Sequence, residues 1–241
     1  MNFEKYINSR LYQLFNVLYK LVIISLLFFF FSTFTLYVFG IIASGIAAFI
    51  IINSSNKDNA LPLILTFWLG FKKNYFKALK ISLIIFVIAF ILIFNTYYFY
   101  HLSLESKTMY SFIALYIMIG LDIIAFTTTI MIMLVCVYFP YLKTFNTIKY
   151  SIIMLFAFPG AFFMLVGLII AFLILSYLFW YLIPLFIPGL FFLLVYLIYN
   201  SRLLRLVDEN GILPLDAFDY LNEFRAKVST KKKTKVNNKN D

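Results

Sequence analysis

One carboxylate stands out as the residue whose type and setting could do chemistry. Asp122 is the only charged residue within residues 108–140, an otherwise uncharged and largely apolar stretch. A carboxylate at membrane depth costs about 2.5–3.5 kcal/mol on insertion scales, so it normally faces a bundle interior or a water-filled cavity. Two interpretations stay open: a site for a proton, cation or polar substrate, or a hydrogen-bonded aspartate that ties helices together.

Three other polar residues of the apolar stretches define the surroundings expected for Asp122. Asn95, Thr127 and Thr128 predict a polar track beside the carboxylate. Alternatively, each bonds to a backbone carbonyl or a neighbouring helix, which is worth about 0.6 kcal/mol on average. Together with Asp122 they form the candidate intramembrane polar site.

Patterns typical of catalysis and metal binding are missing from the sequence. It contains no Gly-rich phosphate loop, nucleophile elbow or pair of carboxylates within an apolar stretch. The single histidine, His101, and the single cysteine, Cys136, have no ligand cluster with metal spacing around them. We therefore expect no catalytic residue, no cofactor and no metal. A lipid-modifying membrane enzyme remains a third alternative.

The elements that must position Asp122 are long and apolar. Uncharged blocks cover residues 21–53, 81–100, 108–140 (apart from Asp122) and 150–201. Because about 18 or more apolar residues suit only a lipid environment, these blocks predict transmembrane helices. The sequence predicts an all-α polytopic transmembrane bundle with about five full crossings. Residues 150–201 cross twice, with a turn at 175–184, and a short re-entrant or returning arm lies near residues 40–53.

The net charge of +10 is spread along the flanks of these blocks, so it encodes membrane topology, and no nucleic-acid partner is expected. If residues 21–53 cross once, 16 of the 20 Lys and Arg residues lie inside and 4 outside. If this block returns, 19 lie inside and only Lys107 outside. The positive-inside rule favours the second arrangement, a multi-pass cell-membrane protein with both termini in the cytosol.

The organisation predicted along the chain has three parts. Residues 1–205 form the bundle and include a cytosolic amphipathic segment at 54–80. Residues 206–228 form a short cytosolic amphipathic helix after a turn at Asn210-Gly211. Residues 229–241 are a disordered Lys-rich tail. The segment at 54–80 predicts a helix in the interface plane, or a docking face for a partner. The residues of this face are Trp68, Phe71, Lys72, Lys73, Tyr75, Phe76 and Lys77.

The tail carries a cluster of lysines that suits the surface of a membrane. A basic residue near anionic lipid contributes about 1 kcal/mol. The alternative is a solvated run that acts only as a topology signal. The predicted lipid-contact residues are Lys231, Lys232, Lys233 and Lys235.

Three stretches resemble the patterns of the YesL-type family of bacterial membrane proteins. Residues 38–49 are similar to the turn after the family's first helix, 67–76 to its Phe-Trp/Lys-Phe segment, and 138–151 to its Phe-Pro-Leu-Leu approach to the later helices. The likeness runs over roughly residues 10–205, and Ala43 stands where the family pattern has proline. The resemblance implies a domain of unknown function with no agreed activity and no site residues to transfer. Family members often accompany carbohydrate uptake systems.

These features together predict an accessory or scaffold protein of the bacterial membrane, associated with a transport system through its amphipathic surfaces. Carbohydrate transport is the association that the resemblance implies. The alternative is a small transporter or channel that uses Asp122. The expected partners are the lipid bilayer and either transporter subunits or a second copy of the chain.

Overall fold

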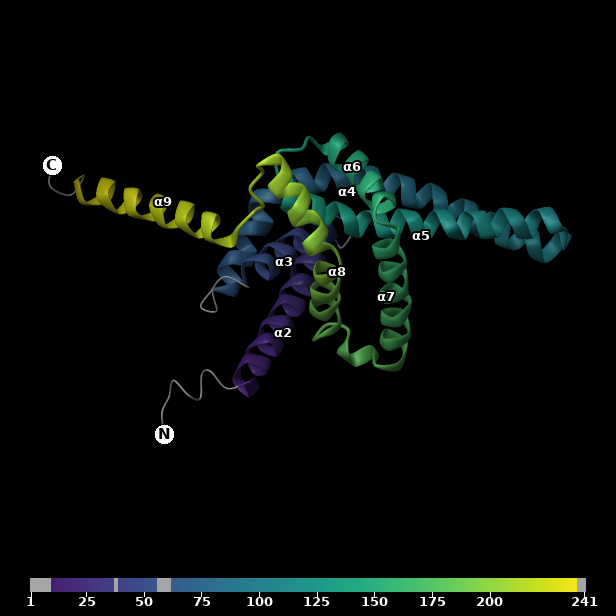
Figure 1. Ribbon diagram of the computed structural model, residues 1–241, viewed down its shortest axis with the longest axis horizontal. Coiled ribbons are helices and arrows are strands. Elements are labelled where there is room, and N and C mark those ends of the chain that lie inside the picture. The colour runs from purple at the N-terminus through teal and green to yellow at the C-terminus, as the bar shows by residue number, and fades with distance from the viewer. Residues whose placement is uncertain (1–9, 37–38, 56–61, 238–241) are drawn as a thin grey trace.

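The protein is all-helical, as the sequence predicts. The computed structural model describes residues 10–36, 39–55 and 62–237, and this part of the chain contains eight α-helices and no strand. Five of the helices are long and apolar enough to cross a membrane. Figure 1 shows their arrangement, and the bounds of each helix are given below.

The first apolar block forms two helices, which confirms the predicted short arm. Helix α2 spans Arg10–Phe34 and α3 spans Ile41–Ser55. The chain turns between them, where Leu36 has a φ of 58°. Gly40 lies in this turn, whereas Ser44 lies inside α3 and donates a hydrogen bond to the Gly40 carbonyl at 2.7 Å.

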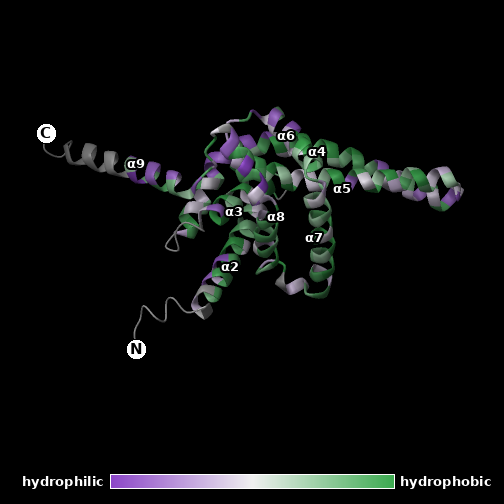
Figure 2. Cartoon of the chain, viewed as in Figure 1, coloured by the Kyte–Doolittle hydropathy of each residue, from purple (hydrophilic) through white to green (hydrophobic). Residues whose placement is uncertain are grey.

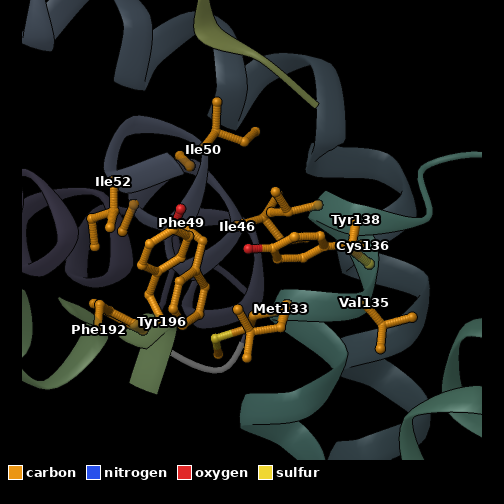
Figure 3. Packing of buried hydrophobic residues seen from close by; sticks show 14 of the residues in the cluster. Ile46, Phe49, Ile50, Ile52, Met133, Val135, Cys136, Tyr138, Phe192 and Tyr196 are labelled. Atoms are coloured by element: carbon orange, nitrogen blue, oxygen red, sulfur yellow. The ribbon is translucent and has the colours of Figure 1, made fainter. Parts of the chain in front are cut away.

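Helix α3 lies at the centre of the core. Every residue from 42 to 52 is buried, so this helix has no exposed face along that length. Phe49 of α3 meets Phe192 at 5.0 Å between ring centroids, and Figure 3 shows both beside Met133. A helix that is apolar all round is stable only when neighbours cover all its sides. The small residues Gly45 and Ala47 let those neighbours approach closely.

Helix α4 spans Leu63–Ser106, and this continuity corrects one prediction. The amphipathic segment at 54–80 and the crossing at 81–100 were expected to be separate elements, the first lying in the interface plane. From residue 63 onward they form one helix of 44 residues, about 66 Å long. The physical reason is local, because no proline or glycine interrupts residues 71–106. Residues 56–61 lie outside the described part of the chain.

Helix α5 spans Met109–Tyr138 and pairs with α4 as a hairpin that extends away from the other helices. The hairpin's outer part has no buried residue over 83–102 of α4 or over 112–126 of α5. We call these two stretches the outer hairpin. In Figure 1 it extends toward the right, whereas α7 descends from the same region, so the apolar helices are not all parallel. Figure 2 shows that the outer hairpin is largely hydrophobic.

The last apolar block contains two helices that are long and apolar enough to cross a membrane, as predicted. Helix α6 (Thr144–Ala157) ends before Pro159, which opens α7 (Pro159–Leu178). A short 3₁₀ turn at Trp180–Leu182 leads to α8 (Ile187–Asn210). Proline suits the first turn of a helix because its missing N–H has no intrahelical partner there. Pro159 therefore marks the boundary between α6 and α7.

Helices α2 and α8 run side by side in the same direction. Gly189 donates its backbone N–H to the Ser25 hydroxyl at 2.8 Å, and further along, Phe28 meets Phe192 at 4.9 Å between ring centroids. A Cβ at Gly189 would collide with the Leu21 carbonyl oxygen, so glycine is required for this close approach. The start of α2 therefore lies at the α7–α8 turn and not at the far end of α8.

The end of α3 lies toward the far end of α8. Asn53 accepts a hydrogen bond from Tyr196 at 3.2 Å and donates to the Leu215 carbonyl at 3.3 Å. The Ser54 hydroxyl accepts the backbone N–H of Ala217 at 2.8 Å. These contacts make α3 a re-entrant arm within the bundle that does not lead back to the side where α2 begins.

The C-terminal region begins where α8 ends. Gly211 has a φ of 63°, a left-handed conformation that glycine adopts readily, which confirms the predicted turn at Asn210-Gly211. Helix α9 then spans Ala217–Asn237. It begins later than the helix predicted for 206–228 and extends into the stretch predicted to be disordered. Residues 1–9 and 238–241 lie outside the described part of the chain.

Candidate functional site

The structure places Asp122 between the two helices of the outer hairpin. The Thr96 hydroxyl of α4 donates a hydrogen bond to the Asp122 carboxylate at 2.7 Å, and Asp122 is half-buried. This bond crosses between α4 and α5 at a point where neither helix has a buried residue. Asp122 therefore joins the two helices of the hairpin, at a distance from the core around α3.

The residues expected beside Asp122 do not gather there. Asn95 donates to the Ile91 carbonyl at 2.8 Å, one turn back in its own helix. Thr127 donates to the Ile123 carbonyl at 2.9 Å, and Thr128 donates to the Ile124 carbonyl at 2.7 Å. All three side chains thus satisfy their polar groups within one helix, and no polar track forms.

Sequence reasoning named Asn95 and missed its neighbour Thr96. The two residues are adjacent, so they point to different sides of α4. Only the packing of α4 against α5 determines that Thr96 faces the carboxylate. A single sequence contains no signal for that choice, because both residues are polar and lie in the same apolar block.

The predicted surface face of α4 divides into two parts. Phe71 packs in an aromatic cluster with Phe31, at 5.0 Å between ring centroids, and Lys77 donates to the Pro140 carbonyl at 3.0 Å. Both residues therefore make contacts within the molecule. The other part of the face lines an aromatic groove of about 530 Å³ between α2 and α4, which the buried Phe71 also lines, and its residues are Trp68, Lys72, Tyr75 and Phe76.

Lys73 joins α4 to the C-terminal helix. Its ammonium group lies 2.7 Å from a Glu223 carboxylate oxygen and 4.7 Å from the centre of the Tyr220 ring. The other Glu223 oxygen pairs with Lys227 at 2.9 Å. The pKa of Glu223 is lowered to about 2, mainly by the hydrogen bond from Lys73 and to a smaller extent by the hydrogen bond from Lys227. Burial raises the pKa of Tyr220, which also bonds with Asn74.

A second set of polar contacts lies at the centre of the bundle, and sequence analysis did not single it out. The Tyr138 hydroxyl of α5 donates to the Asn200 side chain of α8 at 2.6 Å. The Leu215 N–H donates to the Val137 carbonyl at 2.8 Å, beside the contacts of Asn53 with Tyr196 and Leu215. These bonds connect α3, α5, α8 and the segment before α9 through groups that are otherwise costly to bury. Their arrangement is structural, because each polar group bonds to another part of the chain.

The tail lysines stand on the last turns of α9. The backbone of Lys231, Lys232, Lys233 and Lys235 is helical, and their side chains lie outside what the structure describes. Contact with anionic lipid stays a prediction for these residues.

Among the described residues, no cluster of three or more His, Cys, Asp or Glu side chains has the geometry to hold a metal ion. Cys136 is buried in α5, and the His101 ring packs edge-on against Tyr97 at 4.5 Å between centroids. The absence of such a cluster leaves the enzymatic alternative untested.

The helical fold and the five apolar helices define a multi-pass membrane protein. Residues 21–96 match the family described as "Protein of unknown function, DUF624", which is the family of YesL-type bacterial membrane proteins of unknown function. The match extends from α2 into the outer part of α4 and confirms the resemblance predicted from the sequence. No curated protein and no solved structure gives a match.

Proposed function

We propose that this protein is an accessory or scaffold component of the membrane, and that the outer hairpin is the surface that contacts its partner. The observation that carries the proposal is the exposure of large apolar side chains along both helices of the hairpin. Phe94 is 64% exposed and Tyr116 is 69% exposed, and both lie in stretches without a buried residue. Contiguous apolar surface of this kind is typical of a contact with lipid or with another membrane protein.

Asp122 favours a protein partner over lipid alone. Thr96 donates to one carboxylate oxygen, and the half-buried group keeps further acceptor capacity at the surface of the hairpin. An ionisable group facing hydrocarbon is costly, whereas a polar group from a second helix would satisfy it. The partner class we favour is a transporter subunit, which rests on the family resemblance alone. A second copy of this chain is the alternative partner.

No observation favours the alternative that this chain is itself a conduit. Four cavities in the described part of the chain, of about 840, 530, 290 and 250 Å³, do not include Asp122 in their lining. Proteoliposomes test this alternative directly: a solute flux that falls in Asp122→Asn would support a conduit and contradict the scaffold proposal.

The arrangement in the membrane follows from the directions of α2, α3 and α8. The sequence favoured both termini in the cytosol, which requires the first block to return to its starting side. Because α2 passes Gly189 at Ser25 and runs in the same direction as α8, and because α3 ends beside Ala217, the geometry supports a single net crossing of this block. We therefore propose that the end of α8 is cytosolic and that the start of α2 lies outside, which gives 16 Lys and Arg residues inside and 4 outside. Reporter fusions at the two ends would test it, and cytosolic signals from both would contradict it.

Site-specific photocrosslinking in cells tests the scaffold function. A photoreactive amino acid at Phe94 or Tyr116 is expected to give a discrete protein adduct, identified by mass spectrometry as a membrane transport component. Phe163, an equally exposed aromatic residue of α7, is the matched control position. Adducts of the same protein at all three positions, or adducts with lipid alone, would contradict the proposal.

A further inference from the structure

A groove between α7 and α8 combines a long apolar wall with two arginines at one end. Its volume is about 840 Å³, and it opens on the surface of the bundle. Met164 and Leu168 of α7 and Leu197 of α8 form part of the apolar wall. Arg202 and Arg205 also line the groove, beyond the last residue of the uncharged block at 150–201.

The two arginines are placed to bind one anionic group. They are three residues apart on α8, so their side chains lie on the same face. The Arg202 guanidinium donates to the Ile198 carbonyl at 2.6 Å and stands 6.0 Å from the centre of the Phe158 ring, which together orient it. Arginine guanidinium groups match phosphate oxygens in a bidentate manner.

Neither arginine is neutralised by the protein. In the part of the chain that the structure describes, no ion pair joins Arg202 or Arg205 to a carboxylate. Asp208 and Glu209 follow within the same helix and are exposed to solvent. The groove therefore presents two positive charges that lack a carboxylate partner.

The dimensions of the groove suit one leaflet of a bilayer. Its lining on α8 runs from Leu194 to Leu206, which is roughly 18 Å at about 1.5 Å per residue. A single leaflet supplies about half of the roughly 30 Å hydrocarbon core. When the phospholipid headgroup is level with the arginines, its acyl chain would therefore reach the end of the groove that lies deepest in the membrane.

We propose that this groove is a specific binding site for an anionic phospholipid. The headgroup phosphate is held by Arg202 and Arg205, and an acyl chain lies along the wall formed by Met164, Leu168 and Leu197. Basic pockets between transmembrane helices on the cytosolic side recognise anionic headgroups by the same chemistry. Charge and length select this occupant, because the choline cation of zwitterionic phosphatidylcholine offsets its phosphate, whereas an anionic phospholipid brings the net negative charge that balances the two guanidinium groups.

Native mass spectrometry of the full chain in mild detergent tests the proposal. The protein is titrated with phosphatidylglycerol or with phosphatidylcholine of the same acyl chains, and bound lipids are counted. We expect one phosphatidylglycerol to be retained preferentially. Arg202→Gln combined with Arg205→Gln should weaken its binding on the order of 30-fold, since each basic residue contributes about fivefold. Lys143→Gln combined with Lys149→Gln removes two exposed charges outside the groove and should leave binding unchanged.

A second variant separates the groove from surface charge. Leu197→Trp keeps both arginines but fills the apolar part, so it should also lose the retained lipid. Leu197 is 59% exposed, so this change should preserve folding, and a thermal unfolding midpoint verifies that. Equal retention of the two lipids, equal losses in the Arg and Lys double variants, or full retention in Leu197→Trp would each overturn the proposal. A photocrosslinker at Met164 that captures a protein in place of lipid would overturn it as well.

Discussion

Helix α3 and the outer hairpin are both built from apolar residues, yet one is enclosed by protein and the other is exposed along its length. The difference lies in side-chain size. Helix α3 carries Gly45, Ala43, Ala47 and Ala48, which let the neighbouring helices approach closely. The outer hairpin carries large aromatic and branched residues in their place. Hydropathy therefore identifies a membrane helix, but it does not indicate whether other helices cover it.

The largest expected effect comes from truncating matched isoleucines in the two regions. Ile50 of α3 is 0% exposed and Ile93 of the outer hairpin is 64% exposed. Ile50→Ala leaves a cavity and should lower the free energy of unfolding by about 2–4 kcal/mol. Ile93→Ala should change it by less than about 0.5 kcal/mol, because no packed neighbour is lost. Denaturant titration in detergent micelles measures both free energies of unfolding. Equal losses of stability would show that the two regions do not differ in packing.

A second prediction concerns the close contact of α2 with α8, which supports the enclosure of α3. Gly189→Ala places a methyl group against the Leu21 carbonyl and should cost about 1–3 kcal/mol through overpacking. Gly167→Ala in α7 is the control, because a Cβ there has open space. It should be neutral or slightly stabilising, since alanine favours a helix over glycine. Equal free energies of unfolding for the two variants would show that α2 and α8 can move apart without a loss of stability.

The third prediction concerns the polar contact that joins the outer hairpin. Thr96→Val removes the donor to Asp122 and should lower the free energy of unfolding by about 0.6–1.7 kcal/mol. Thr129→Val removes only a bond to the Ala125 carbonyl of its own helix and serves as the control. A double-mutant cycle with Asp122→Ala gives the coupling directly. A coupling of zero would mean that side-chain packing alone joins the hairpin.

The smallest effect is expected at the exposed contact between α4 and α9. The hydrogen bonds from Lys73, which has the larger effect, and from Lys227 lower the pKa of Glu223 to about 2. A lowered pKa means that the contact is favoured above the ordinary carboxyl range and is lost as the pH falls from there toward about 2. Spin labels on α4 and α9 should report a distance that stays constant at neutral pH and broadens in acid or in 1 M salt. Glu223→Gln should broaden it at neutral pH, whereas Glu209→Gln in α8 should not.

Much of the fold could be predicted because long apolar blocks specify helices by themselves. The break near Gly40, the turn at Asn210-Gly211 and the two crossings in residues 150–201 all follow from local residue types. The continuity of the amphipathic segment with the crossing at 81–100 could have been predicted, because no helix-breaking residue separates them. The candidate polar site was less predictable, because Asn95, Thr127 and Thr128 each bond within one helix.

The sequence by itself determined that this protein is a helical membrane protein, since hydrophobic length and charge placement are local properties of the chain. Only the tertiary structure decided which apolar helix is enclosed, that Thr96 faces Asp122, and that Arg202 and Arg205 end an apolar groove. Those features depend on how helices far apart in the sequence pack together. Packing is set by the fit of whole surfaces, and a pattern along one helix does not encode its neighbour.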